Sequence, residues 1–222
     1  MKKFTLLDAG ALIIWMLPAI YLFSIYGGLP QTVPVHYGLS GSVDRYGSKN
    51  EFLTTSIVLM GVSALVYLLL KFLPSIDPKK KVRYGESTFQ KLAFGIVIFI
   101  AALNICIMYA TAHRGFDVGK LIFPLAGLLF VFIGNMMNSI KPNYFAGVRT
   151  PWTLENEDNW RATHRLASRL WVAGGMVIAV ITFILPAGAG TIVFICGVAV
   201  LAFIPVIYSY IYFKKHRQNQ NA

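Results

Sequence analysis

The sequence predicts an all-α, polytopic membrane protein, a bundle of six transmembrane helices. Hydrophobic residues make up 56% of the 222-residue chain, and most of them gather in six long runs. A spanning helix needs about 20 consecutive apolar residues. Backbone polar groups in hydrocarbon must bond within their own segment, so runs of this length are expected to be helical. The six runs lie at residues 6–27, 54–73, 91–111, 120–138, 168–187 and 190–213.

The uneven distribution of basic residues predicts how the chain is oriented. All but four of the 20 Lys and Arg residues lie in or beside the two termini and the loops that six spans place on the same side. Because Lys and Arg next to a span resist translocation, this side is expected to be the cytosol, with both termini inside. The four residues assigned to the outer side are Arg45, Lys49, Arg114 and Lys120.

The net charge of +11 is therefore mainly a signal of topology. A basic inner surface also suits anionic membrane lipids, which we expect as partners, and no direct nucleic-acid partner is predicted. We divide the chain into residues 1–89, with an ordered outer loop at 28–53 and a basic inner loop, and residues 90–222, with an inner loop at 139–167.

The spans lack ionisable side chains at their centres. Asp8, Lys71, Lys91 and Lys120 fall at span ends, where lysines can extend to the headgroups. An ionisable residue at mid-membrane depth is the usual mark of a proton-coupled transporter or voltage sensor, so these classes are disfavoured. Asn104 and Asn135 are the main polar residues at depth, and they are expected either to hydrogen-bond between helices or to line a substrate path.

Sequence motifs of soluble-type catalysis are missing. The chain has no Walker A loop, no H-E-x-x-H, no C-x-x-C and no G-x-S-x-G run. We therefore expect no enzyme activity, no cofactor and no bound metal.

The outer loop carries one pair of residues that are capable of acid–base chemistry or metal binding. Pro30 and Pro34 favour an extended entry and the loop glycines supply turns, so a compact hairpin is expected. His36 and Asp44 can meet across it, either as a hydrogen bond that holds the loop's shape or as a metal or acid–base pair. Zinc needs at least three protein ligands, which disfavours the metal.

The inner loops combine helix-capping residues, aromatic residues and charge. Pro74 and Pro78 are expected to end the second span. Thr150 before Pro151, or Thr153 before acidic residues, fits a helix start, and a helix that begins near Asn156 is expected to run into the fifth span. On it Glu157, Arg161, Arg165 and Arg169 form a charged ladder, and Trp160, His164, Ala167 and Trp171 a neighbouring stripe. This helix is expected either to lie at the interface with its tryptophans in the headgroups or to dock a cytosolic partner.

These loops resemble the SdpI family of bacterial immunity proteins. The resemblance lies in the run KPNYFAGVRTPWTL at residues 141–154, and in residues 34–37, Gly41, 44–46, Lys49, 76–80, Trp160 and 163–165. It implies a multi-pass plasma-membrane protein that protects its host from a secreted, membrane-active toxin peptide. It also implies that the protein senses that peptide and holds a cytosolic autorepressor at the membrane.

The resemblance assigns roles to residues of both loops. The outer residues implied to face toxin are His36, Tyr37, Asp44, Tyr46 and Lys49. The inner residues implied to bind the repressor are Asn143, Arg149, Thr150, Trp152, Trp160, His164 and Arg165. Two other classes remain open from the sequence. One is an exporter of small solutes or peptides that uses Asn104 and Asn135, and the other is a hydrolase that uses His36 with Asp44, or His164.

Overall fold

The computed structural model describes residues 3–38, 41–76, 86–113 and 116–220. The predicted run of basic residues at 79–83, together with Pro78 and Arg114, lies outside them. The elements in chain order are α1 (Leu6–Tyr26), β1 (Thr32–Tyr37), β2 (Val43–Ser48), α2 (Lys49–Ile76), α3 (Glu86–Ala112), α4 (Gly119–Met137), α5 (Pro151–Glu155), α6 (Glu157–Ile184) and α7 (Ala187–Gln220).

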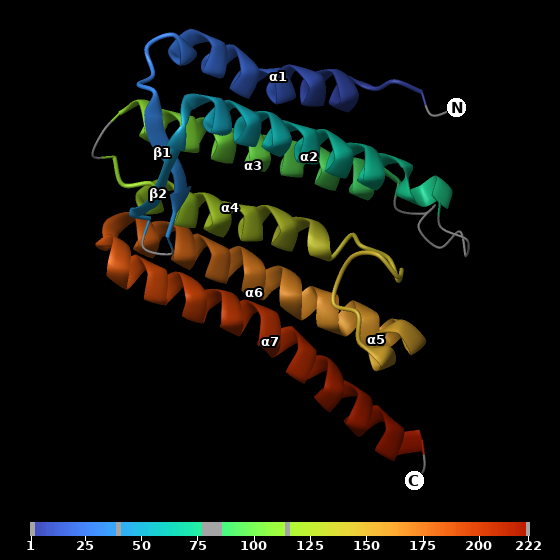
Figure 1. The fold of residues 1–222 in the computed structure, drawn as a ribbon. Coiled ribbons are helices and arrows are strands. Elements are labelled where there is room, and N and C mark those ends of the chain that lie inside the picture. Colours follow the sequence, from blue (N-terminus) through green and yellow to red (C-terminus); the bar gives the residue numbers. More distant parts are fainter. Residues whose placement is uncertain (1–2, 39–40, 77–85, 114–115, 221–222) are drawn as a thin grey trace.

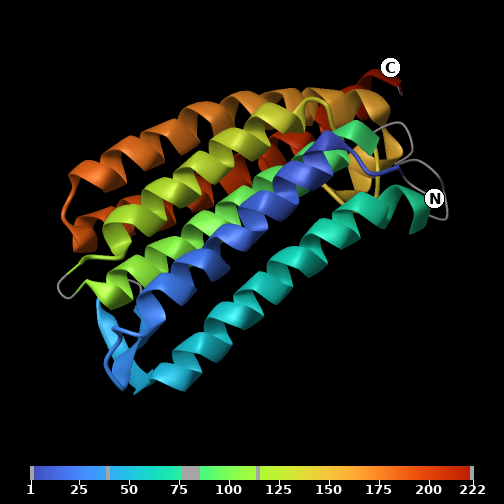
Figure 2. The same ribbon diagram turned by 90° about the horizontal axis from the view of Figure 1, so that it is seen from above.

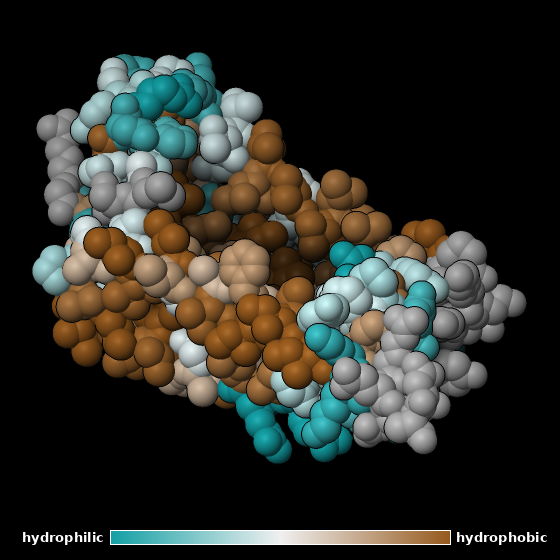
Figure 3. Space-filling view, turned by 90° about the horizontal axis from the view of Figure 1, so that it is seen from below, coloured by the Kyte–Doolittle hydropathy of each residue, from teal (hydrophilic) through white to brown (hydrophobic). Residues whose placement is uncertain are grey.

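The prediction of a six-span membrane protein is confirmed. Among the described residues, six helices are long and apolar enough to cross a bilayer, and they are α1, α2, α3, α4, α6 and α7. They lie side by side, with the hairpin at one end and both chain termini at the other (Figures 1 and 2). In the space-filling view a broad apolar face separates polar residues gathered at the two ends (Figure 3). The chain is therefore a multi-pass membrane protein.

The helices form two groups of three that meet along α3 and α4. Helix α3 packs against both α1 and α2, and these three are called the first trio. Helix α6 packs against both α4 and α7, and these are called the second trio. The division of the chain near residue 90 into two parts stays a prediction.

Glycines bring α4 and α6 into backbone contact. A Cβ atom at Gly127 would lie 2.7 Å from both the Ala179 nitrogen and the Gly175 oxygen, and one at Gly134 would lie 2.9 Å from the Val172 nitrogen. Small residues allow this close approach in membranes, where packing and not the hydrophobic effect drives helix association. Gly127 and Gly134 are therefore points of close packing between the two helices.

The helix boundaries differ from the predicted ones where capping overrides hydropathy. Helix α2 begins at Lys49, directly after β2, and continues two residues beyond Pro74, which was expected to end it. A proline near a helix end removes only one backbone hydrogen bond, so the helix tolerates it there. The helix expected near Asn156 is confirmed, because the Asn156 side chain accepts a hydrogen bond from the Asn159 N–H at 2.8 Å and caps α6.

Candidate functional site

The outer loop folds into the expected hairpin, an antiparallel pair of β1 and β2. Across it the His36 Nδ1 lies 2.6 Å from Asp44 Oδ1, with 63% and 47% of the two side chains exposed. The loop-shaping hydrogen bond expected from the sequence is therefore present. Within the described part of the chain, no third His, Cys, Asp or Glu joins these two to form a cluster able to hold a metal ion.

The hairpin is fixed to the end of the first trio that lies opposite the chain termini. Val33 of β1 is fully buried in a cluster with Leu22, Phe52 and Met108, one from each helix of that trio. The Tyr37 hydroxyl lies 3.3 Å from Thr111 Oγ1 of α3, and burial raises the pKa of this tyrosine. These contacts make the hairpin an ordered cap over α1, α2 and α3.

The tip of the hairpin also meets the second trio. Gly41 has a φ of +78°, which favours glycine, and a Cβ there would lie 2.5 Å from the Gly119 nitrogen at the start of α4. No other residue fits this position without moving the backbone of α4.

The predicted toxin-facing residues separate into exposed and anchoring ones. Tyr46 is 63% exposed, and the side chains of His36 and Asp44 are also exposed. Lys49 instead places its ammonium 4.3 Å from the centroid of the Tyr26 ring, a cation–π contact that ties α2 to α1. Three of the five residues are therefore accessible to a ligand, while Tyr37 and Lys49 hold the hairpin in place.

The inner segment after α4 is a tightly bonded turn centred on Asn143. Its side-chain oxygen accepts from the backbone N–H of Phe145 and Ala146 at 2.7 and 2.8 Å, and its amide donates to the Lys141 and Ala146 carbonyls. All of these bonds are local, so Asn143, which is buried, shapes the segment from within.

His164 joins this turn to α6. Its Nδ1 donates to the Trp160 carbonyl at 2.8 Å, and its Nε2 accepts from the Val148 N–H at 3.2 Å. Gly147, with a φ of +113°, passes so close that a Cβ there would lie 2.3 Å from His164 Nε2. Both ring nitrogens are occupied, so His164 acts as a hydrogen-bonding residue of α6.

Trp160 lies in the protein interior, and not in the headgroups as the interfacial-helix interpretation expected. Only 1% of it is exposed, its indole N–H donates to the Ile140 carbonyl at 2.8 Å, and its ring stacks on His164 at 4.0 Å between centroids. The cause is the chain segment 139–148, which folds over the first turns of α6 and covers this face. Hydropathy along one helix does not reveal such a cover.

Helix α5 is held against α6 and α7 by a polar junction. Thr150 caps α5 in reciprocal hydrogen bonds with Thr153. The Trp152 indole donates to Ser209 Oγ of α7 at 2.7 Å, and the Asn159 amide of α6 donates to the Ser209 carbonyl at 3.0 Å. Ser209 could not be predicted, because a lone serine within an apolar run carries no signal of its partners.

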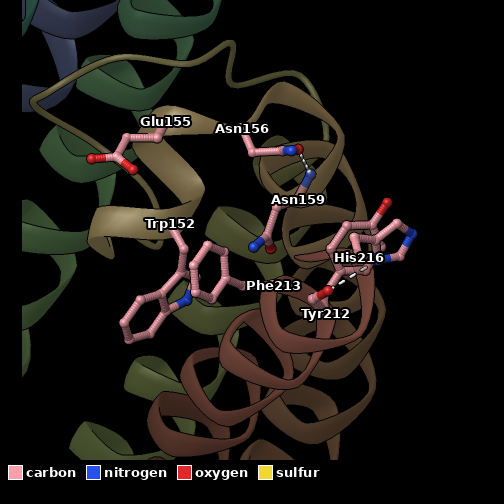
Figure 4. A pocket seen from close by; sticks show the side chains of 7 residues that line it. All are labelled: Trp152, Glu155, Asn156, Asn159, Tyr212, Phe213 and His216. Atoms are coloured by element: carbon pink, nitrogen blue, oxygen red, sulfur yellow. Dashed lines mark hydrogen bonds between the residues drawn. The ribbon is translucent and has the colours of Figure 1, made fainter. Parts of the chain in front are cut away.

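A pocket of about 430 Å³ opens beside this junction (Figure 4). The aromatic rings of Trp152 and Phe213 form one wall, at 6.1 Å between centroids. Tyr212 and His216 stack at 4.0 Å in another part of the lining. The remaining lining residues are Glu155, Asn156 and Asn159. An aromatic pocket with polar edges suits the side chain of a protein partner.

The charged residues of the inner segment are exposed. Arg161 donates to Glu157 at 2.6 Å, the first rung of the expected ladder, and Arg165 and Arg169 follow on the exposed face of α6. Arg149 donates to the Tyr144 carbonyl. Of the seven predicted partner-binding residues, the structure exposes the two arginines and half-buries Trp152, and it buries Asn143, Thr150, Trp160 and His164.

One ionic network was not expected. The Lys71 ammonium lies 2.7 Å from Asp8 Oδ1, and only 13% and 3% of these side chains are exposed. Tyr67 also donates to Asp8, at 2.5 Å, and Gln90 of α3 donates to Thr5, which caps α1. Lys71 therefore does not extend to the headgroups as predicted, because a buried carboxylate on α1 offers it a partner.

The two asparagines at depth differ. Asn104 is buried and donates to the Ser56 carbonyl of α2 at 3.2 Å, so its expected role between helices is confirmed. The cavity beside it measures about 10 Å³, the room of a single water molecule. Asn135 is exposed on the surface of α4, and the expectation of an inter-helix bond is wrong for it. An exporter with a path along these residues is therefore not favoured.

Most of the chain is similar to known proteins. Residues 139–209 match the SdpI/YfhL protein family, and residues 13–62 match a domain of unknown function, DUF1648. The chain is 25% identical to Immunity protein SdpI of Bacillus subtilis (strain 168) over 195 residues, which cover 86% of this chain and 88% of that protein. It is 34% identical to an uncharacterized protein of Archaeoglobus fulgidus over 59 residues, or 27% of this chain and 30% of that one. No solved structure matches.

Proposed function

We propose that this chain is a membrane immunity protein. The premise is that it carries the SdpI/YfhL family signature in a six-span membrane protein. The observation that carries the proposal is the extent of the similarity to Immunity protein SdpI, which covers nearly nine-tenths of both chains. Similarity of this extent supports a shared membrane architecture.

The role is non-enzymatic in this proposal. The protein protects its cell from a secreted, membrane-active toxin peptide by binding it at the outer surface. The exposed side chains of His36, Asp44 and Tyr46 supply the contact, because they stand on a hairpin that is rigidly attached to three helices. A preorganised surface loses little conformational entropy on binding.

Signalling to a cytosolic repressor is the second half of the proposal. The pocket lined by Trp152, Phe213 and Glu155 lies at the end of the bundle opposite the hairpin. It receives an apolar side chain of the repressor, and the exposed Arg149 and Arg165 lie at the same end. Asn143, Trp160 and His164 contribute by holding the segment in shape, since they are buried.

The direct test is survival. Cells lacking their own immunity protein are transformed with the chain, exposed to the sporulation-delaying toxin peptide and counted. We expect more survivors than with the empty vector, fewer with Asp44→Ala, and full protection with Asp158→Ala, which removes an exposed carboxylate from the inner end. Equal survival with and without the chain contradicts the immunity role.

The signalling half has its own test. Trp152→Ala is expected to preserve survival but to reduce the amount of repressor that sediments with membranes. If Trp152→Ala and the unchanged chain retain the same amount of repressor, the pocket is not the docking site.

A further inference from the structure

A second cleft at the inner end of the bundle, separate from the aromatic pocket, is lined with positive charge. It measures about 300 Å³ and lies between the segment that follows α4 and the first turns of α6. Lys141 lines one side, and Arg161 and Arg165 line the other, one helical turn apart. These three cations share the cleft with a single carboxylate, that of Glu157.

The positive charge is only partly neutralised. Glu157 accepts from Arg161 at 2.6 Å. Over residues 3–38, 41–76, 86–113 and 116–220, neither Lys141 nor Arg165 has a carboxylate within ion-pair distance. Guanidinium groups bind phosphate oxygens in a forked geometry, and the lysine adds a compact positive charge. The cleft is therefore complementary to a phosphate group.

The shape of the cleft is fixed by buried contacts beneath it. The Trp160 indole donates to the Ile140 carbonyl at 2.8 Å, which joins the two walls. His164 uses both ring nitrogens within the protein, so it supplies neither charge nor a donor to the cleft. The two walls of the cleft are therefore already in place before a ligand binds.

The position of the cleft matches the headgroup region of a bilayer. It begins at Asn138, directly after α4 ends at Met137, and it lies above the apolar part of α6. Asn135 lies about one turn before Asn138 on α4 and is exposed, although it belongs to a helix long and apolar enough to span the membrane. An exposed amide at this depth is costly in hydrocarbon, but it suits the ester and glycerol oxygens just below a phosphate.

We propose that this cleft binds the phosphate of an anionic phospholipid of the inner leaflet, with Lys141, Arg161 and Arg165 on the phosphate and Asn135 on the glycerol-ester region. Basic pockets between helix ends on the cytoplasmic side are the usual place for such headgroups. The Asn135 side chain favours a lipid over a free phosphate ion, because only a lipid extends from the cleft into the membrane. This inference does not depend on the immunity role.

The test compares two double variants with the same loss of charge. Lys141→Gln with Arg165→Gln changes the cleft, whereas Lys91→Gln with Arg169→Gln removes two exposed inner-side cations outside it. Purified protein in detergent micelles is titrated with dioleoylphosphatidylglycerol, and bound lipid is counted by native mass spectrometry. We expect the cleft variant to bind about tenfold more weakly and the control to stay within about twofold of the unchanged protein.

Three further measurements distinguish the binding of an anionic lipid from that of other ligands. Dioleoylphosphatidylcholine is expected to bind no better to the unchanged protein than to the cleft variant, and inorganic phosphate is expected not to displace the anionic lipid. Asn135→Leu is expected to weaken lipid binding without changing the unfolding temperature in lipid-free micelles. Equal affinity in the two double variants overturns the proposal, and so does full displacement by inorganic phosphate. Should the cleft double variant unfold, the single Arg165→Gln variant gives the same comparison against Arg169→Gln.

Discussion

The Asp8 carboxylate and the Lys71 ammonium lie 2.7 Å apart inside the first trio, joining α1 to α2 at the end of the bundle that carries both chain termini. Tyr67 donates to the same carboxylate. A buried ion pair is sensitive to the loss of one partner, because the remaining charge is left without compensation.

Lys71→Met is therefore expected to lower the free energy of unfolding by about 3–5 kcal/mol. Thermal unfolding in detergent micelles measures it. Lys120→Met, which removes an exposed lysine at the opposite end of the bundle, serves as the control and is expected to change little. Adding Asp8→Asn to Lys71→Met should restore part of the loss, and a Lys71→Met protein as stable as the unchanged one would rule out this pair as a structural contact.

Gly127→Ala is expected to destabilise the second trio by about 1–3 kcal/mol, because the new methyl group would lie 2.7 Å from backbone atoms of α6. Gly61→Ala is the matched control, since no atom lies within 4 Å of its Cβ position in the middle of α2. There alanine is expected to be neutral or to stabilise by up to about 1 kcal/mol. Equal unfolding temperatures for the two variants would contradict the close packing of α4 on α6.

Trp160→Phe is expected to loosen the inner segment, because it leaves the Ile140 carbonyl without its donor at a cost of about 1–3 kcal/mol. Limited trypsin digestion measures this locally, with faster cleavage at Arg149 as the expected result. Phe145→Leu, at an exposed position of the same segment, should leave the cleavage rate unchanged. Identical digestion of Trp160→Phe and the unchanged protein would show that the indole bond does not hold the segment.

The orientation predicted from the basic residues is tested by labelling in intact cells. In a background with Cys106→Ser and Cys196→Ser, a membrane-impermeant maleimide should label the Tyr46→Cys variant and not the Glu155→Cys variant. Both side chains are exposed, so the difference reports the compartment. Labelling of the two variants from the same side would reject the topology.

The spans and the hairpin could be predicted because their signals are local. Runs of apolar residues define the helices, and prolines and glycines define the outer loop. The environment of Trp160 could not be predicted, since it is set by the Ile140 carbonyl from a segment 20 residues away. The charge pair of Asp8 with Lys71 was missed for the same reason, because 63 residues separate them.

The site predictions were likewise reliable for contacts between residues that are close in the sequence, and not for contacts between distant ones. The contact of His36 with Asp44 follows from two strands joined by a short turn, which the sequence indicates. The division of the inner residues into buried and exposed ones depends on which face of α6 the preceding segment covers. The stripe of Trp160 and His164 shows that one face differs from the others, but not whether lipid, a partner or the chain itself lies on it.

The contact of Gly41 with Gly119 affects how hairpin variants are to be interpreted. Because the hairpin packs on the first trio and its tip contacts α4, it links the two trios at the end opposite the chain termini. A substitution in the hairpin can thus have two effects. It can lower the affinity for a ligand, or it can weaken the contact between the first and second trios. A bulky replacement at Gly41 removes no side chain that a ligand could contact, so its effect reports on the geometry of the hairpin and on its contact with α4.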